Sequence, residues 1–230
     1  MGESGKIIAR SAMKQVSTDF RPVSNLPTAA AMVAWLGVQL AALGICAARF
    51  PLWARAPRAT EQLALFAMLA AQTAAASLLF PILLRNIRST LIAIVVAWPM
   101  AELASFLADA STDRLIGTEL FVSVWLVTLH LYSRSLNNSR DKLMATAVAG
   151  MLSLGGPLLW YLRMEFGEAG VSSARLGLFG PVCGAISLAA GVDSPFIAWG
   201  ELIILFAIAL TIFFAKKKNP IILSTGYPQI

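Results

Sequence analysis

Six stretches of about 20 mostly apolar residues constrain the fold of this 230-residue chain more than any other feature. They cover residues 28–48, 63–84, 91–110, 115–132, 143–162 and 195–215. A helix needs about 20 consecutive apolar residues to cross a hydrocarbon core of about 30 Å. Because the connections between the stretches are too short to hold another domain, the sequence predicts one all-α membrane protein with six transmembrane helices.

The amino-acid composition agrees with a protein that uses lipid as its solvent. Hydrophobic residues make up 58% of the chain and charged residues 13%, whereas soluble domains have about 45–50% apolar and about 25% charged residues. The mean hydropathy is +0.74. About 25 polar and basic residues precede the first apolar stretch, which is longer than the n-region of a cleavable signal peptide. We therefore expect this stretch to remain as the first helix.

The Lys and Arg residues indicate the orientation of the helices, because cytoplasmic loops carry an excess of them. With six helices, four clusters fall on one face: Lys6, Arg10, Lys14 and Arg21; Arg85 and Arg88; Arg134, Arg140 and Lys142; and Lys216, Lys217 and Lys218. The opposite face receives Asp113, Glu165, Glu168 and Asp193, with Arg49, Arg55 and Arg58 as the exception to the rule. The sequence predicts a multi-pass protein of the bacterial inner membrane with both termini in the cytoplasm. Its net charge of +6 then indicates attraction to anionic lipid and no binding of nucleic acid.

The chain divides into three parts. Residues 1–25 form a basic cytoplasmic leader in which Lys6, Arg10 and Lys14 recur every four residues, as in an amphipathic helix that lies on the membrane surface. A disordered basic segment is the alternative for this leader. Residues 26–218 form the transmembrane bundle, and residues 219–230 form a cytoplasmic tail.

One further apolar segment, residues 176–192, does not fit the pattern of six spans. If it crossed the membrane, the helix count would become seven and the basic cluster at residues 216–218 would lie outside. Gly180 and Pro181 would also break such a helix in its first third. We therefore expect a re-entrant pair of half-helices that enters the membrane from the outer face between helices five and six. A seventh span is the alternative.

Four acidic residues lie within the predicted spans or at their outer edges: Glu102, Asp109, Glu119 and Glu201. Ionisable groups in lipid are costly, usually face the interior of a helix bundle, and are candidates for a functional site. In that interpretation they line a polar path that takes a substrate outward. In the alternative, each acid reaches the outer headgroups or pairs with Arg114 or Arg175.

The other chemically reactive side chains are few. Cys46 and Cys183 both fall on the outer side, where an oxidising compartment would permit a disulfide between them. The alternative is that both are buried as small hydrophobic residues. His130 has no second His or Cys nearby, so the sequence predicts no metal site. Because no carboxylate pair accompanies this histidine, we expect neither a cofactor nor an enzymatic activity.

Three local stretches carry a resemblance to a known family. They are RSTLIAIVVAWPMAELASF at residues 88–106, LYSRSLNNSRDKLMATA at residues 131–147 and FGPVCGAISLAAG at residues 179–191. Together with the basic leader, the six spans and the re-entrant segment, they resemble the permease subunit of ABC-2 type transporters. In that family a membrane dimer is driven by separate ATPase subunits.

The resemblance implies roles for several residues. An ATP-binding subunit on a separate chain would contact the cytoplasmic segments 85–90 and 133–142, through Arg85, Arg88, Arg134 and Arg140. An outer gate would include Gly180, Pro181 and Gly184. The permease would pair with a second permease chain, as a homodimer or a heterodimer, and would export its substrate by alternating access.

A function from a different class also fits the sequence. A non-catalytic membrane subunit would hold together a larger respiratory, photosynthetic or motility complex. In such a subunit the acidic residues would pair with neighbours, no continuous cavity would cross the bundle, and no ATPase would bind.

Overall fold

The computed structural model of the chain describes residues 26–53, 63–108, 112–136, 138–166, 180–191 and 195–218. This part contains helices α2 (Leu26–Trp53), α3 (Leu63–Leu83), α4 (Ile87–Leu107), α5 (Thr112–Ser135), α6 (Ser139–Phe166), α7 (Pro181–Ala190) and α8 (Pro195–Lys218). The described residues include no strand, so the all-α prediction is confirmed for them. The leader at residues 1–25, the tail at residues 219–230 and Asp109 lie outside the described residues.

Five of these helices are long and apolar enough to cross a membrane: α2, α3, α4, α5 and α8. They correspond to five of the six predicted spans and indicate a multi-pass membrane protein. The sixth predicted span corresponds to α6, whose 28 residues would measure about 42 Å. The described part of α6 is not among the five candidate spans, so the count of six stays a prediction.

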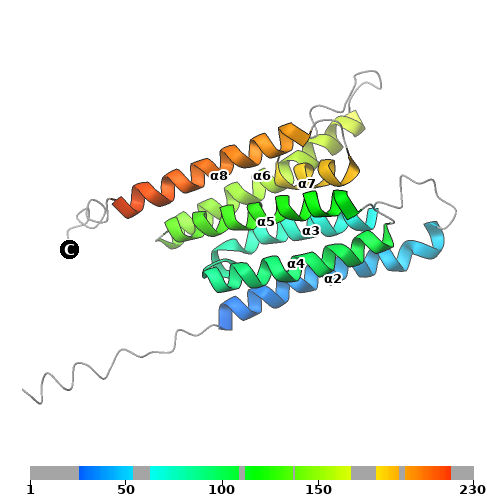
Figure 1. Cartoon of the computed structure of the whole chain (residues 1–230), viewed down its shortest axis with the longest axis horizontal. Coiled ribbons are helices and arrows are strands. Elements are labelled where there is room, and N and C mark those ends of the chain that lie inside the picture. The colour runs from blue at the N-terminus through cyan, green and yellow to red at the C-terminus, as the bar shows by residue number, and fades with distance from the viewer. Residues whose placement is uncertain are drawn as a thin grey trace, which may run out of the picture.

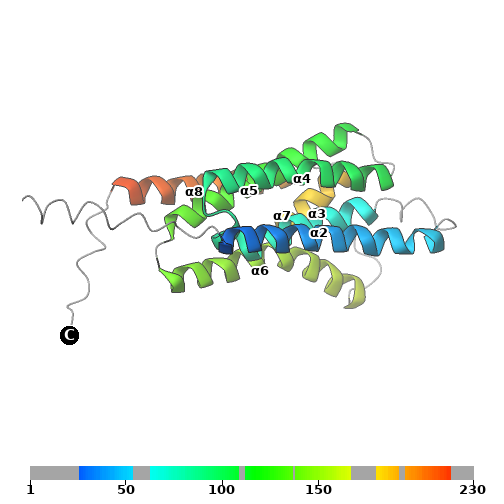
Figure 2. The same cartoon turned by 90° about the horizontal axis from the view of Figure 1, so that it is seen from below.

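The long helices lie side by side and alternate in direction along the bundle (Figure 1). Figure 2 shows α4, α5 and α8 in one layer and α2 and α6 on the opposite side, with α3 and α7 between them. α3 contacts α2, α4, α5, α6 and α7, and its central position explains why it is one of the two most buried candidate spans, with α5.

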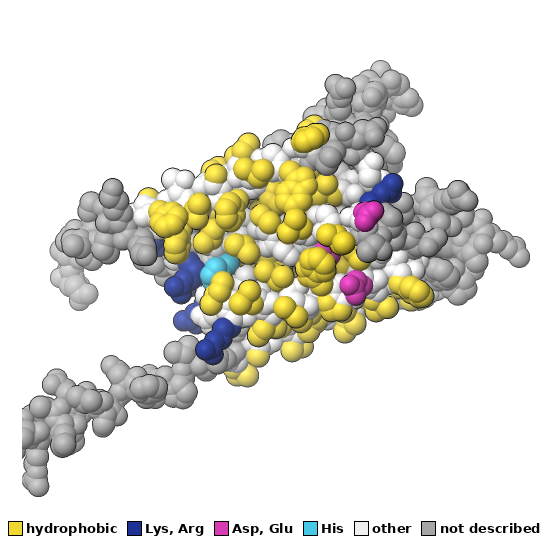
Figure 3. All heavy atoms as spheres, in the orientation of Figure 1, with side chains coloured by type: hydrophobic (Ala, Val, Ile, Leu, Met, Phe, Trp, Pro, Cys, Tyr) yellow, Lys and Arg dark blue, Asp and Glu magenta, His cyan; other side chains and the backbone are white. Residues whose placement is uncertain are grey.

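The two ends of the bundle carry different charges. We name one the basic end, where α2 begins, α8 ends, and Arg85, Arg88, Arg134 and Lys216 lie. Figure 3 shows Lys and Arg side chains there around the single histidine, with Asp and Glu side chains toward the other end, which we name the acidic end. α5 begins at the acidic end, with Asp113 in its first turn. This separation matches the two faces inferred from the loops, although the orientation in a membrane stays a prediction.

The turns at the basic end are shorter than predicted. Residues 87–90, expected in a loop, form the first turn of α4. The helix begins this early because Asn86 and Ser89 cap its start. The Asn86 N–H donates a hydrogen bond to Ser89 Oγ at 3.3 Å. Residues 133–142 were also expected in a loop, but the last turn of α5 carries Arg134 and the first turn of α6 carries Arg140. These arginines therefore lie on helix ends.

Small residues allow α4 to pack closely against its neighbours. Four of its alanines are fully buried: Ala93, Ala97, Ala101 and Ala104. Their spacing of three or four residues places them on one face of the helix, and small side chains let helix backbones approach closely in membrane proteins. The opposite face exposes Leu91, Val95 and Phe106, which suits contact with lipid or with a partner helix.

A buried amide group joins α2, α3 and α4. Gln72 Nε2 donates to Gln39 Oε1 at 3.2 Å and to the Ala97 carbonyl oxygen at 3.0 Å. The Trp35 indole N–H donates to the Gln72 carbonyl oxygen at 3.2 Å. Because a polar group in an apolar interior costs free energy unless it is hydrogen-bonded, these contacts determine which faces of the three helices meet.

A second buried polar group joins α3, α5 and α6. Ser77 Oγ lies 2.6 Å from Ser153 Oγ and accepts a hydrogen bond from the Trp125 indole N–H at 3.1 Å. The Ser77 hydroxyl also lies 2.7 Å from the Thr73 carbonyl oxygen. No charged residue takes part, so this group holds the helices together without the cost of burying a charge.

The short helix α7 begins inside the bundle. Gly180, the residue directly before α7, is buried. It packs against the backbone of Leu152, at the middle of α6. The other end of α7 reaches Gly191, which packs against Arg114 in the first turns of α5, at the acidic end. With 10 residues, α7 would measure about 15 Å, half the thickness of a hydrocarbon core. Pro181 begins this helix and does not break it.

Candidate functional site

The start of α7 is held by a carboxylate from another helix. Glu201 of α8 accepts hydrogen bonds from the Gly180 N–H, with distances of 3.0 Å to Oε1 and 3.2 Å to Oε2. Gly180 has no side chain that could cap the helix, and Pro181 at the first helical position has no N–H. A negative charge at a helix N-terminus is favourable, so Glu201 both caps α7 and attaches it to α8.

Close contacts seat α7 on α5. A Cβ atom added at Gly184 would lie 2.7 Å from the Phe121 ring, so a larger residue there would displace this buried ring. Phe121 in turn meets Trp199 of α8 edge to face, with ring centroids 5.5 Å apart. All three residues predicted for the outer gate, Gly180, Pro181 and Gly184, are buried, and α7 contacts α3, α5, α6 and α8.

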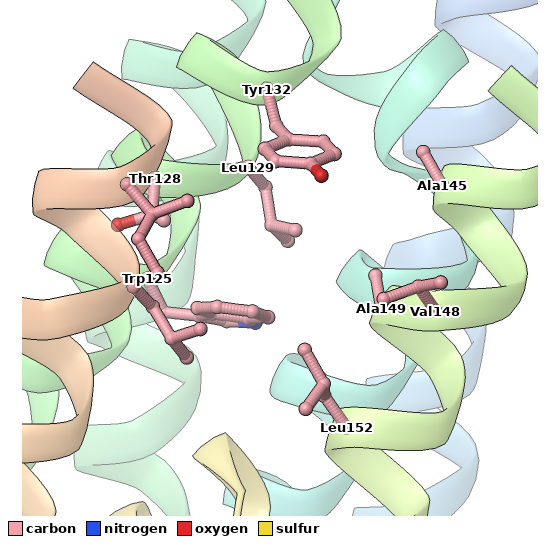
Figure 4. A pocket seen from close by; sticks show the side chains of 10 residues that line it. Trp125, Thr128, Leu129, Tyr132, Ala145, Val148, Ala149 and Leu152 are labelled. Carbon is pink, nitrogen blue, oxygen red and sulfur yellow. The ribbon is translucent and has the colours of Figure 1, made fainter. Parts of the chain in front are cut away.

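A cavity of about 170 Å³ lies between α5, α6 and α8. Figure 4 shows the side chains from α5 and α6 that face this space. Most of the lining is apolar, from Leu129, Ala145, Val148, Ala149, Leu152, Leu205 and Ile208, together with Trp125, Thr128 and Tyr132. Leu152 lines the cavity with its side chain and contacts Gly180 with its backbone. We name this space the central cavity. The start of α7 therefore lies next to the end of the central cavity that is nearer the acidic end of the bundle.

The polar atoms around the central cavity are largely engaged elsewhere. The Thr128 hydroxyl donates to the Val124 carbonyl oxygen at 2.8 Å, and the Trp125 N–H donates to Ser77. A ligand in the cavity would meet the apolar side chains and the ring faces of Trp125 and Tyr132. Tyr132 lies at the end of the cavity that is nearer the basic end of the bundle. The cavity is therefore suited to an apolar group.

The predicted acids occupy different environments. Glu119 of α5 is fully buried, and neither carboxylate oxygen has a hydrogen-bond partner among the described residues. Glu102 of α4 lies close enough to interact with Glu119 electrostatically, but it is on the exposed face of its helix. Glu201 is half-buried and holds α7. The structure thus places one acid inside the bundle, one at α7 and one on the surface.

Two of the four arginines that were predicted to contact an ATPase lie in a common groove. A groove of about 850 Å³ at the basic end is lined by residues from α2, α4, α5 and α8 and from the turn before α4, and we name it the basic groove. Arg88 and Arg134 line it together with His130, Ile92 and Phe213. Arg85 and Arg140 are exposed at the same end but do not line the groove.

The two cysteines are buried apart from one another in the fold, one on α2 and one on α7. Cys183 carries a free thiol, so the disulfide with Cys46 is not formed in this structure. Burial of both residues agrees with the alternative interpretation, in which they act as small hydrophobic residues.

Several residues around the site were not singled out from the sequence. Phe121, Trp125, Leu152 and Ser153 connect α7 and the central cavity to the rest of the bundle. They carry no charge and lie in apolar stretches, so no residue pattern distinguishes them from ordinary packing residues. Ser77 follows Thr73 by one helical turn within an apolar helix, and this polar pair is a signal that could have indicated a buried contact.

No protein-family model, curated protein or solved structure matches this chain.

Proposed function

We propose that this chain is the permease subunit of an ABC-2-like export complex, in which a separate ATP-binding subunit drives a substrate outward by alternating access. The chain lies in the bacterial inner membrane with six spans and both termini in the cytoplasm, and it pairs with a second permease chain. It performs no chemistry itself. Residues 176–192 re-enter the membrane from the outer face, and α7 is the returning half of that segment.

The position of α7 is the observation that carries this proposal. A half-length helix stands between the last two long helices, and it begins next to the central cavity. A gate needs an element with two discrete packings. α7 is a short helix joined to α8 by the hydrogen bonds between Gly180 and Glu201, so a movement of α8 would carry the start of α7 with it.

The central cavity supports an apolar or amphipathic substrate. Its lining comes mostly from aliphatic side chains of α5, α6 and α8, and neither Glu119 nor Glu201 lines it. A strongly charged substrate would lose its hydration there without gaining hydrogen bonds. In the proposed cycle the substrate occupies the central cavity, α7 moves aside, and the substrate leaves past Glu201.

The exposed apolar faces support pairing with a second permease chain. Only 17% of the span residues of α8 and 28% of those of α2 are buried. Lipid covers such faces in a monomer, and a second permease would cover part of them in a dimer. Glu102 on the exposed face of α4 favours a protein partner there, since a carboxylate facing lipid is costly.

Purification in a mild detergent tests the proposed function. The tagged full chain is isolated, its partners are identified by mass spectrometry, and the eluate is assayed for ATP hydrolysis. We expect an ATP-binding subunit to co-purify and hydrolysis to fall in the variants Arg85→Ala and Arg140→Ala, which change exposed residues at the basic end. Asp113→Ala removes a charge at an exposed position of the acidic end and should leave hydrolysis unchanged.

A scaffold subunit is the second candidate function. The observation that favours it is Glu102, whose exposed carboxylate would pair with a neighbouring subunit of a larger complex. Recovery of the chain only in a large assembly without an ATPase would support the scaffold and would exclude the permease.

A further inference from the structure

We propose that the basic groove binds an anionic phospholipid of the adjacent membrane leaflet. The phosphate lies between Arg88 and Arg134, and an acyl chain lies along the apolar wall of the groove. This site is separate from the central cavity and does not depend on the proposed transport function. Basic pockets between helix ends at the cytoplasmic side of a membrane are suited to anionic headgroups.

The polar end of the basic groove provides donors for a phosphate. Arg88 lies in the first turn of α4 and Arg134 in the last turn of α5, and both side chains are exposed to the groove. The first turn of α4, from Ile87 onward, also lines it. The N–H groups of a first helical turn lack partners within the helix and carry partial positive charge, which favours an anion. Two guanidinium groups and a helix start therefore converge on one space.

His130 is a second, independent feature of the same space. Its side chain is only 8% exposed, yet it lines the groove. Because the Leu84 carbonyl oxygen accepts a hydrogen bond from Nδ1 at 2.8 Å, the ring is fixed and Nδ1 carries a proton. Nε2 makes no hydrogen bond with the described residues. His130 therefore keeps one ring nitrogen without a partner among the described residues, in a side chain that is almost fully buried and forms part of the groove wall. A ligand in the groove would complete the hydrogen bonding of this ring.

The charge of the groove lining is of one sign. Among the described residues that line it, Arg88 and Arg134 are charged and no Asp or Glu occurs. The described acids of α4, α5 and α8, namely Glu102, Asp113, Glu119 and Glu201, all lie toward the acidic end. Asp141, in the first turn of α6, lies at the basic end but does not line the groove. An anion in the basic groove therefore meets no carboxylate among the described residues that line it.

The apolar wall distinguishes a phospholipid from a soluble anion. Met32 of α2, Ile92 of α4 and Phe213 of α8 line the groove beside the arginines. Ile92 is 53% exposed and is continuous along α4 with the exposed face that carries Leu91 and Val95. The groove thus opens onto the surface that meets the hydrocarbon of the membrane. A ligand that fits it needs an anionic head and an apolar chain that leads into the membrane.

Native mass spectrometry of the purified full chain in detergent tests this site. Phosphatidylglycerol is titrated against phosphatidylcholine, and the bound lipid is counted. The variant Arg88→Gln/Arg134→Gln should weaken phosphatidylglycerol binding roughly 30-fold, which corresponds to about 2 kcal/mol for two charges near the membrane surface. The control Arg85→Gln/Arg140→Gln removes the same charge at the same end but outside the groove lining, and it should weaken binding less than about 3-fold.

Further variants separate the lipid from other anionic ligands. Ile92→Ser should weaken phosphatidylglycerol binding without changing the competition by inorganic phosphate, because it alters only the apolar wall. Equal weakening by both arginine pairs would show diffuse attraction and would overturn the proposal. Displacement of the lipid by inorganic phosphate at equal concentration would assign the groove to a soluble anion. If Arg88→Gln/Arg134→Gln abolished co-purification of a partner protein and left lipid binding intact, the groove would be a protein contact.

Discussion

Replacement of Gly180 by alanine should destabilise the protein more than any other single methyl addition at the described glycines. Gly180 has φ +96° and ψ 159°, a region that is essentially restricted to glycine and costs other residues about 1–3 kcal/mol. The added Cβ would also lie 2.0 Å from the Leu152 carbonyl oxygen. Since that neighbour is backbone, it cannot rotate away, and overpacking of this kind costs about 1–3 kcal/mol more.

The two costs add to about 2–6 kcal/mol for Gly180→Ala. In proteins of 150–250 residues, 1 kcal/mol shifts the Tm by about 2–4 °C. We therefore expect the apparent Tm of the detergent-solubilised chain to fall by at least about 4 °C. The measurement is the fraction of protein that stays monodisperse in size-exclusion chromatography after heating.

Gly200→Ala is the matched control for this prediction. Gly200 lies in α8 next to Glu201, and an added Cβ would have no atom within 4 Å. Alanine is a better helix former than glycine by about 1 kcal/mol, so the Tm of this variant should be unchanged or slightly higher. A Gly180→Ala variant as stable as wild type would refute the placement of α7 against α6. Equal losses in both variants would show that the reasoning about space is wrong.

Three further substitutions test the contacts that hold α7 and the core, by the same heating assay. Glu201→Leu removes the acceptor for the Gly180 N–H and should cost about 1.5–3 kcal/mol, whereas Glu201→Gln keeps an acceptor and should cost less. Gln72→Leu leaves the buried Gln39 Oε1 without its donor and should cost about 1–3 kcal/mol. The double variant Gln39→Leu/Gln72→Leu should cost less than the sum of the single changes. Trp125→Phe removes the hydrogen bond to Ser77 and should cost about 1 kcal/mol. Additive costs in the two glutamine variants would contradict the contact between Gln39 and Gln72. No loss of stability in Trp125→Phe would contradict the contact between Trp125 and Ser77.

The helical architecture was predictable because apolar stretch length is a direct signal of a span. Five predicted spans coincide with five long apolar helices of the described chain. The ends of the helices were less predictable. The first turn of α4 forms because Asn86 and Ser89 cap it, and a search for apolar residues alone begins the helix too late, at residue 91.

The positions of the acidic residues depend on the rotation of each helix, which the sequence indicates for α4 but not for the other helices. Glu102, Glu119 and Glu201 have similar apolar neighbours in the sequence, yet Glu119 is buried, Glu102 is exposed and Glu201 caps α7. Which of them faces inward depends on how each helix is rotated in the bundle. The alanine face of α4 fixes that rotation for Glu102, which lies on the opposite side from Ala97 and Ala101. A helical wheel of α4 would therefore have placed Glu102 on the surface.

The structural effect of Gly180 and Pro181 could be predicted from the sequence only in part. The pair was expected to interrupt a helix, and in the structure it begins α7. Proline is tolerated at the first helical position and glycine is compatible with a positive φ. A glycine followed by a proline can either interrupt a helix or begin one, for the same conformational reasons. The sequence alone therefore did not distinguish the two possibilities. The rest of the predicted re-entrant segment, residues 176–179 and 192, lies outside the described residues.

Accessibility of the Cys183 thiol tests the central claim, that α7 is an outer gate, most directly. The Cys46→Ala variant leaves Cys183 as the only thiol, and it is 8% exposed near the start of α7. In sealed right-side-out vesicles that contain the co-purified ATP-binding subunit, a membrane-impermeant maleimide should label Cys183 slowly at rest and faster during ATP hydrolysis. The control Asp113→Cys, placed at an exposed position of the acidic end in a Cys46→Ala/Cys183→Ala background, should label rapidly in both states. Labelling of Cys183 that stays at its resting rate throughout ATP hydrolysis would contradict the gate and the export function that depends on it.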